Sequence, residues 1–211
     1  MRVILASSSP RRRDLLALLG IPFEVVDPSF VEAVRQDRPA DEQARDFARC
    51  KARSCVDRCP DALILGSDTL IALGTRVLGK PGNADEARSM LQLLRGREHL
   101  ICSAVALAGP GGVMLDDAVE RAQVWMRPFS DADLDAYLAT GESLGKAGAY
   151  SIQGAGGTLV EQIDGDFPAV VGLPLRLVAA MLARQGIRGT IDVETIYTTK
   201  PYPNWARFSH P

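Results

Sequence analysis

Histidine is scarce in this sequence, and the few cysteines lack a metal-binding spacing. Only His99 and His210 are present among 211 residues. Three of the four cysteines, Cys50, Cys55 and Cys59, are separated by four and then three residues, which matches no common zinc pattern. His99 follows the stop of a predicted helix, where a structural role suits it better than a catalytic one. We therefore expect buried or idle thiols and no Ser-His-Asp or Cys-His catalysis.

Long apolar runs and a strong net charge are also missing. No stretch reaches the roughly 18 apolar residues that a membrane helix needs. The apolar run at the N-terminus is too short for a signal peptide, and the positive charge mostly follows it. A formal net charge of −2 gives no global basic field for a nucleic acid polymer. We expect a cytoplasmic protein that contacts neither a membrane nor a nucleic acid polymer.

A hydrophobic content of 46% over 211 residues supports one domain or two closely packed lobes. Apolar runs predict strands at 2–6, 62–65, 100–108, 113–125 and 158–163, with 70–73 extended after a break at 66–69. Capping and stop signals predict helices at 10–19, 41–57, 84–95, 131–140 and 174–185, of which the one starting at Pro174 is the last. This order predicts an α/β fold with a partly antiparallel sheet and flanking helices.

Residues 187–211 differ in composition from the preceding domain, 1–186, being rich in Tyr, Pro, Thr and Trp. We interpret them as a C-terminal extension that forms a surface arm. Its aromatic residues could dock on a partner subunit or fold back on their own chain: Tyr197, Tyr202, Trp205 and Phe208. Because Tyr and Trp are favoured at interfaces, we expect a homodimer.

The segment SSSPRR at 7–12 lies where a strand gives way to a helix. Ser9 suits the N-cap and Pro10 suits the first helical position. Free backbone N–H groups and the positive end of the helix dipole favour an anion there, and two arginines add bidentate phosphate donors. A phosphate site and a plain capped basic turn both fit this segment on its own.

The sequence GSDT at 66–69 follows the apolar run ALIL. A buried strand that ends there presents Asp68 at the edge of the sheet, where ligand sites of α/β proteins gather. A carboxylate in that place can orient water or hold a divalent cation. On its own, a turn-forming aspartate is the simpler interpretation.

Residues 74–81, GTRVLGKP, nearly match a P-loop. Pro81 stands where the motif needs a hydroxyl residue for Mg²⁺, and the segment lies in a predicted hairpin rather than before a helix. Both departures argue against a P-loop kinase. Lys80 remains a candidate point charge for a phosphate.

A glycine-rich stretch, GKAGAYSIQG, covers residues 145–154. Its glycines permit close backbone approach, Lys146 supplies charge, and the Gln153 amide offers a donor and an acceptor to a base edge. A flexible surface loop is the alternative interpretation.

Taken together, the chain resembles the Maf family of nucleoside triphosphate pyrophosphatases. It carries, in the family's order, LASSSPRRRDLL, FARCKARS, GSDT, LGKP, GREH, GKAGAYSIQG and IDGDFPAVVGLPL. Each motif is weak alone, but the ordered set is specific and covers residues 1 to about 186. The resemblance implies a mixed α/β fold with two lobes around a cleft, related to the inosine triphosphatase fold. It also implies a divalent metal cation, Mg²⁺ or Mn²⁺, and often a homodimer.

The resemblance assigns roles to individual residues of this sequence. It implies that Asp68 is the catalytic carboxylate, either as general base or as a metal ligand, and that Glu32 is a second metal ligand. It ties three residues to substrate choice: Arg11, Thr69 and Gln153. It implies further cleft residues that bind the substrate: Ser7, Arg12, Lys51 and Lys80.

Thr69 and the KAGAY and IQG patterns resemble the dTTP/UTP branch of the family. We therefore predict hydrolysis of dTTP and UTP, and of modified analogues, to the monophosphate and pyrophosphate. Three positions depart from that branch, with Ser67 for Ala, Gly145 for Asp and Ser151 for Gly. Because a Ser-Asp pair is more typical of the 7-methyl-GTP branch, 7-methyl-GTP pyrophosphatase is one alternative. A non-catalytic nucleotide-binding regulator of cell division is the other.

Overall fold

The apolar runs of the sequence form the centre of a seven-stranded sheet. In the computed structural model, which describes residues 1–208, the strand order is β2-β1-β3-β5-β6-β7, and β4 pairs with β3. The strands are β1 Val3–Ala6, β2 Glu24–Val25, β3 Leu63–Leu73, β4 Arg76–Leu78, β5 Glu98–Ala108, β6 Met114–Met126 and β7 Val160–Asp164. β1 runs parallel to β2 and β3, and the other pairings are antiparallel. The predicted mixed α/β fold is confirmed.

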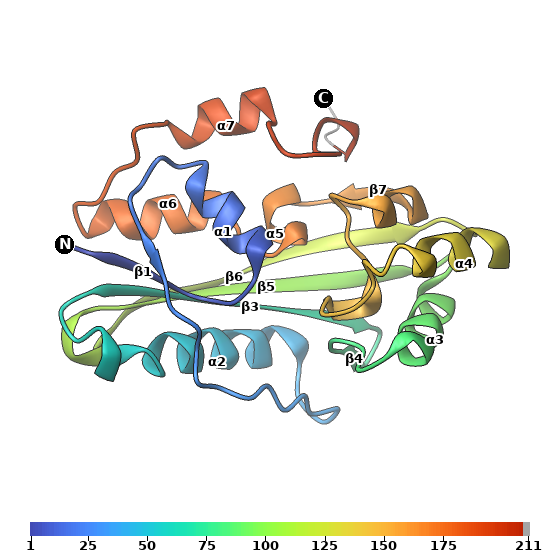
Figure 1. Ribbon diagram of the computed structural model, residues 1–211, viewed down its shortest axis with the longest axis horizontal. Coiled ribbons are helices and arrows are strands. Elements are labelled where there is room, and N and C mark those ends of the chain that lie inside the picture. Colours follow the sequence, from blue (N-terminus) through green and yellow to red (C-terminus); the bar gives the residue numbers. More distant parts are fainter. Residues whose placement is uncertain (209–211) are drawn as a thin grey trace.

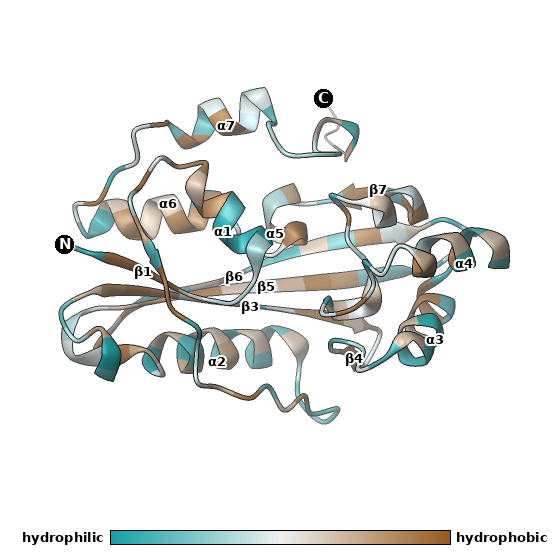
Figure 2. Ribbon diagram, in the orientation of Figure 1, coloured by the Kyte–Doolittle hydropathy of each residue, from teal (hydrophilic) through white to brown (hydrophobic). Residues whose placement is uncertain are grey.

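Helices cover both faces of this sheet (Figure 1). On one face lies α2, Ala40–Arg53; on the other lie α1, Pro10–Ala17, α5, Phe167–Val171, and α6, Leu175–Arg184. α3, Ala84–Leu94, and α4, Asp131–Ala139, flank one end, and α7, Val193–Thr199, lies outside α6. Short 3₁₀ turns occur at Val56–Arg58, Pro110–Gly112, Ala147–Ala149, Ala155–Leu159 and Ala206–Phe208. Hydrophobic residues concentrate in the central strands, whereas the helices carry both hydrophobic and hydrophilic residues (Figure 2).

Helix α2 approaches the sheet closely because small residues face it. Ala44, Ala48 and Ala52 are fully buried. A Cβ built on Gly66 of β3 would lie 2.2 Å from the Ala48 carbonyl oxygen, so any side chain at that position would displace the helix. Since α2 also carries Lys51, this contact fixes where that lysine meets the sheet.

One edge of β3 is covered by two different strands with a gap between them. β1 pairs with β3 up to Gly66, and β4 pairs with it only from Ile71 onward. Within residues 1–208, positions 67–70 therefore have no strand partner on that edge, although they pair with β5 on the other edge. The GSDT motif faces this gap.

The predicted break at 66–69 is wrong. β3 runs without interruption from Leu63 to Leu73, because the polar residues of GSDT keep their ladder with β5. Asp68 therefore lies in mid-strand rather than at a strand end. The predicted hairpin is confirmed, because residues 74–75 turn the chain from β3 into the antiparallel β4. A P-loop would instead require a helix directly after this segment.

The predicted helix starts are mostly confirmed. Asn83 caps α3, with its side chain accepting from the Glu86 amide at 2.9 Å, and Ser130 begins α4 with a full capping box. Ser9 occupies the N-cap position of α1, but its side chain makes no capping hydrogen bond. α2 ends four residues before the predicted boundary, and α6 is not the last helix.

The extension after residue 186 is not a surface arm in the part that the structure describes. It forms α7 and a final turn, and Ile196, Trp205 and Phe208 belong to the main hydrophobic core. The Trp205 ring stacks on Phe167 with centroids 5.6 Å apart. The alternative that the aromatic residues fold back on their own chain is therefore the observed one. Residues 209–211, including His210, lie outside the described residues.

No helix within residues 1–208 is long and apolar enough to cross a membrane.

Candidate active site

A cavity of about 470 Å³ lies beside the gap in the β3 edge. The turn from β1 into α1, the segment after β2, the segment after β4 and the 145–153 stretch all contribute to its wall. Eight of the nine predicted site residues line it: Ser7, Arg11, Arg12, Glu32, Lys51, Thr69, Lys80 and Gln153. The ninth, Asp68, is buried with 1% of its surface exposed, beneath Lys51. The fold thus brings together residues that are far apart in the sequence.

Arg12 is held from three sides. Its Nε donates to the Gly172 carbonyl at 2.9 Å, Nη2 donates to the Thr69 hydroxyl at 3.1 Å, and Nη1 reaches the Ser7 hydroxyl at 3.5 Å. Thr69 in turn lies 2.9 Å from the Ser103 hydroxyl, which anchors it to β5. A guanidinium fixed in this way binds an anion with little further loss of side-chain entropy.

Two adjacent arginines face the same cavity. Burial and the neighbouring Arg12 charge lower the pKa of Arg11, and burial lowers that of Arg12. Burial and the repulsion between the two guanidinium groups therefore make their positive charges less favourable when no anion is bound. A polyphosphate between them would offset both effects, so this part of the cavity is suited to bind one.

Lys51 lies between two carboxylates. Its Nζ is 2.6 Å from Glu32 Oε1 and also bonds to Asp68 Oδ1. Glu32 further pairs with Lys80 Nζ at 2.8 Å. Burial raises the pKa of Glu32, but Lys51 and Lys80 outweigh it and lower that pKa to about 2. Glu32 is therefore anionic across the physiological range.

Asp68 and Thr69 point to opposite faces of β3, as neighbouring residues of a strand do. Asp68 meets Lys51 of α2, whereas Ser67 and Thr69 meet Gly172 and Arg12 on the other face. Burial raises the pKa of Asp68 above its usual range, although Lys51 opposes this. A carboxyl group with a raised pKa is better suited to accept a proton near neutral pH.

One oxygen of Asp68 has no partner. Oδ2 is buried and makes no hydrogen bond within residues 1–208. A buried unpaired carboxylate oxygen is costly, and a divalent cation prefers such hard oxygen ligands. Asp68 Oδ2 and the Glu32 carboxylate therefore fit a metal ion at the cavity, although no group of three or more His, Cys, Asp or Glu side chains gathers for one in that part of the chain.

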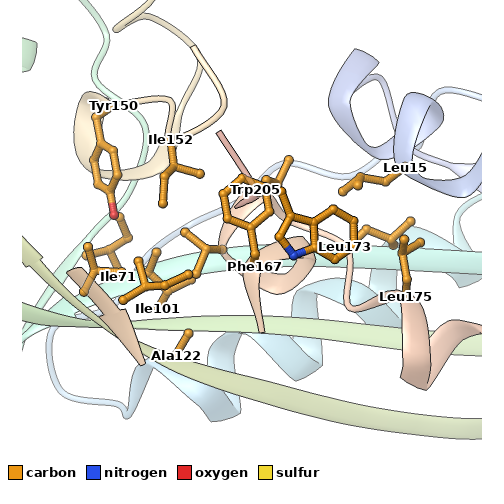
Figure 3. Packing of buried hydrophobic residues seen from close by; sticks show 14 of the residues in the cluster. Leu15, Ile71, Ile101, Ala122, Tyr150, Ile152, Phe167, Leu173, Leu175 and Trp205 are labelled. Carbon is orange, nitrogen blue, oxygen red and sulfur yellow. The ribbon is translucent and has the colours of Figure 1, made fainter. Parts of the chain in front are cut away.

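Apolar residues form another part of the cavity wall. Ile71, Ile101, Ile152 and Tyr150 line it, and Figure 3 shows the four at the same end of the buried cluster. Tyr150 is fixed by His99, whose Nε2 lies 2.8 Å from the hydroxyl, and burial lowers the pKa of His99 to about 4. His99 thus has the structural role predicted for it. Gln153 lines the same cavity and is half-buried.

Sequence reasoning missed two groups that shape the site. The Gly172 carbonyl accepts from both Arg12 and Ser67, and φ of +126° at this residue favours glycine. Ser103 links Thr69 to the Ala169 carbonyl at 2.6 Å. Two features of the sequence could have indicated these groups. Gly172 belongs to the motif VVGLPL, and Ser103 is a lone serine within the apolar run of β5.

The cysteines contribute nothing to this site. All four are free thiols, and three of them, Cys55, Cys59 and Cys102, are buried. The prediction of buried thiols is confirmed for these three.

Comparisons with known proteins agree with the motifs. A family model described as Maf-like protein matches residues 2–185. A dTTP/UTP pyrophosphatase of Anaeromyxobacter dehalogenans is 46% identical over 188 residues, covering 88% of this chain and 94% of the relative. Proteins with the same description from Moorella thermoacetica and Deinococcus radiodurans are 44% and 40% identical, each over 88% of this chain and over 96% and 94% of their own lengths.

Among solved structures, the Staphylococcus aureus Ham1 protein is similar with a TM-score of 0.39 and 13% identity, over 61% of this chain and 73% of that one.

Proposed function

This chain belongs to the family of Maf-like proteins, and from that premise we propose that it hydrolyses dTTP and UTP to the monophosphate and pyrophosphate. The observation that carries the proposal is the pairing of a buried carboxylate, Asp68, with a cavity lined by Arg11, Arg12, Lys51 and Lys80. A cationic cavity suits a triphosphate, and a carboxylate with a raised pKa suits the activation of water.

In the proposed reaction a water oxygen attacks the α-phosphorus. The bond from that phosphorus to the bridging oxygen of the β-phosphate breaks, and pyrophosphate leaves with the electron pair. Asp68 accepts the proton that the water loses. Arg11, Arg12, Lys51 and Lys80 stabilise the charge that develops on the leaving group.

The proposed cofactor is a divalent metal cation, Mg²⁺ or Mn²⁺. Glu32 would hold it, since this group remains anionic. Asp68 Oδ2, a buried unpaired oxygen, would be the second ligand in the alternative role in which Asp68 binds the metal and is not itself the base. When bound, such an ion lowers the pKa of its water and neutralises phosphate charge. Both carboxylates bond to Lys51, so we expect this lysine to turn from them toward the phosphates when the ion binds.

Substrate choice is proposed to depend on Gln153, Thr69 and Arg11. The Gln153 amide complements the O4 and N3–H edge of uracil or thymine, because it offers a donor and an acceptor side by side. Thr69 acts through Arg12, to which it is hydrogen-bonded, and so influences the phosphate position. The isoleucines of the wall offer a surface for one pyrimidine ring.

The homodimer and the cytoplasmic location stay predictions. Trp205 and Phe208 are buried within their own chain, so these aromatic residues give no support for a dimer interface. The family resemblance is the remaining support for a homodimer. A monomer mass by light scattering at micromolar concentration would contradict the dimer.

The test of the function is an assay of purified protein with Mg²⁺ or Mn²⁺ and a nucleotide panel. We expect pyrophosphate and a nucleoside monophosphate from UTP and dTTP, and loss of activity with EDTA that either metal restores. Release of orthophosphate would contradict the reaction, and higher kcat/KM for 7-methyl-GTP would contradict the substrate branch. Binding without any hydrolysis would favour the alternative of a non-catalytic regulator.

A further inference from the structure

The C-terminal extension reaches the stretch that carries Gln153. The Asn204 side chain donates from Nδ2 to the Ile152 carbonyl at 2.8 Å and to the Gly154 carbonyl at 3.1 Å. These two carbonyl groups belong to the residues on either side of Gln153. One amide group therefore holds the backbone before and after the residue proposed to read the base.

Asn204 is itself firmly anchored. Trp205, the next residue, is buried, stacks on Phe167, and meets the Tyr197 ring edge-on with centroids 5.0 Å apart. Asn204 adopts φ of +65°, which asparagine tolerates better than most residues and which turns the chain toward the Gln153 stretch. The donor is thus attached to the core rather than to a free tail.

A second contact holds the same stretch from another element. The Glu142 carboxylate, which follows α4, accepts from the Ala155 amide at 3.2 Å. The backbone from Ile152 to Ala155 is therefore fixed both by the extension and by the segment after α4. Fixing this backbone limits the directions in which the Gln153 side chain can enter the cavity.

We propose that Asn204 is a positioning residue for base recognition, acting through Gln153. This inference rests on the proposed function and extends it to a segment beyond residues 2–185, which the family model matches. Without the Asn204 amide, the Ile152 and Gly154 carbonyls lose a shared donor and the Gln153 stretch becomes more mobile. A mobile amide discriminates less between bases, because preorganisation of a polar contact is what makes it selective.

The test compares Asn204→Gly with the wild type for UTP and GTP. Glycine suits the positive φ, so this variant removes the amide without straining the backbone. We expect the ratio of kcat/KM for UTP over GTP to fall about tenfold, mainly through a higher KM for UTP, while kcat for UTP changes less than about twofold. Asn204→Asp, which turns the donor into an acceptor facing two carbonyl groups, should reduce the ratio at least as much.

Two controls separate positioning from general damage. Glu194→Gln breaks an exposed ion pair with Arg176 in the same extension, away from the Gln153 stretch, and should leave the ratio unchanged. In a Gln153→Ala background, Asn204→Gly should cause no further loss of selectivity, since the residue acts through Gln153. Hydrogen exchange should rise at the Gly154 and Gly157 amides in Asn204→Gly and should stay at the wild-type rate in Glu194→Gln.

The outcomes distinguish this inference from the proposed function. A wild type that prefers UTP, with an unchanged ratio and unchanged hydrogen exchange in Asn204→Gly, overturns only the inference. Equal loss of selectivity from Asn204→Gly in the wild-type and Gln153→Ala backgrounds also overturns it. A wild type that releases no pyrophosphate from any nucleotide overturns the proposed function, and with it the role of Asn204 in base recognition.

Discussion

A carboxyl group buried beside a lysine has a protonation state set by opposing effects. For Asp68, burial favours the neutral acid and Lys51 favours the carboxylate, with burial the larger of the two. For Glu32, the two lysines outweigh burial. One lysine thus contacts two carboxyl groups with different tendencies to accept a proton, which is how acid–base roles are divided in active sites.

Replacing Asp68 tests this assignment most directly. We expect Asp68→Asn to lower kcat by about 10²–10⁴-fold, because the isosteric amide cannot accept the proton. The rise of wild-type activity with pH, as Asp68 loses its proton, should be absent from the residual activity of the variant. Pyrophosphate release measured across pH, with thermal unfolding as the control for folding, checks both. Wild-type kcat in a folded variant would exclude Asp68 from the chemistry.

Ser67 has a structural explanation that does not involve the base. Its hydroxyl is fully buried and donates to the Gly172 carbonyl at 3.1 Å, the same oxygen that accepts from Arg12. Ser67→Ala should cost roughly 1 kcal/mol of stability, since Arg12 still satisfies that oxygen. The UTP over 7-methyl-GTP preference should stay within about twofold of the wild type, a change worth under roughly 0.5 kcal/mol. A reversed preference in the kinetic comparison would tie Ser67 to the base after all.

At the scale of elements, the site exists because β1 is short. β1 stops at Ala6, opposite Gly66, and β4 begins only opposite Ile71. The turn into α1 therefore places Ser7 and the two arginines beside an open stretch of β3 edge. A longer β1 would pair with GSDT and remove the space in which these groups meet.

α7 docks on the rest of the protein through a buried acid. The Tyr197 hydroxyl donates to Asp166 Oδ1 at 2.6 Å, and Asp166 also caps α5 by accepting from the Ala169 amide at 3.0 Å. Burial raises the pKa of Asp166 from 3.8 to about 6, although both hydrogen bonds oppose it. Between these pH values the folded protein binds more protons than the unfolded chain. The contribution of this group to stability is therefore greatest below pH 3.8 and declines as the pH rises through about 6.

Asp166→Asn should stabilise the protein at pH 8 by roughly 1–3 kcal/mol, because asparagine buries no charge. Its Oδ1 can still accept from the Ala169 amide, while its Nδ2 would donate to the Tyr197 hydroxyl oxygen in place of accepting from it. Most of the gain should be lost at pH 4, where the wild-type acid is protonated in the folded protein and roughly half protonated in the unfolded chain. Denaturant unfolding of both proteins at pH 4 and pH 8 measures the difference. A variant that is less stable than the wild type at pH 8 would show that the carboxylate itself is needed there.

The elements that the sequence predicted and those that it missed differ in a physical way. Strands β5 and β6 and the capped helices α3 and α4 follow from local patterns. The placement of Arg12, Asp68 and Lys80 around one cleft did not follow from such patterns and was implied only by the resemblance to the Maf family. β3 did not follow from local patterns either, because GSDT has turn-like composition while its pairing with β5 keeps it extended. α7 did not, because VETIYTT is rich in β-branched residues, and an Asp192 cap and packing of Ile196 stabilise it instead.

At the scale of the whole molecule, the extension and the preceding domain share one core. The main cluster of buried residues runs from Val3 in β1 to Phe208 in the final turn. Figure 3 shows Trp205 beside Phe167, between the residues near the cavity and those under α1 and α6. A boundary drawn at residue 186 from composition and motifs therefore does not separate two independently packed units within residues 1–208.

Truncation after Gly186 tests this shared core. The deletion removes Ile196, Trp205 and Phe208, whose side chains are each at least 95% buried, and it uncovers Phe167 beneath them. Burial of each large apolar side chain contributes roughly 1.5–3 kcal/mol. Because their sum is comparable with the whole stability of a domain, about 5–15 kcal/mol, we expect the truncated protein to be largely unfolded or insoluble at 37 °C.

The matched control for this truncation is Ile191→Ser, at a position of the same extension that is 44% exposed. It should change the free energy of unfolding by less than about 0.5 kcal/mol. Thermal and denaturant unfolding of the full chain, the truncated chain and this variant provide the measurement. Residues 1–186 would be an autonomous domain, and the extension an accessory, if the truncated chain unfolded at the wild-type midpoint. A truncated chain that refolds only when a peptide of residues 187–211 is added would instead show that the extension completes the core.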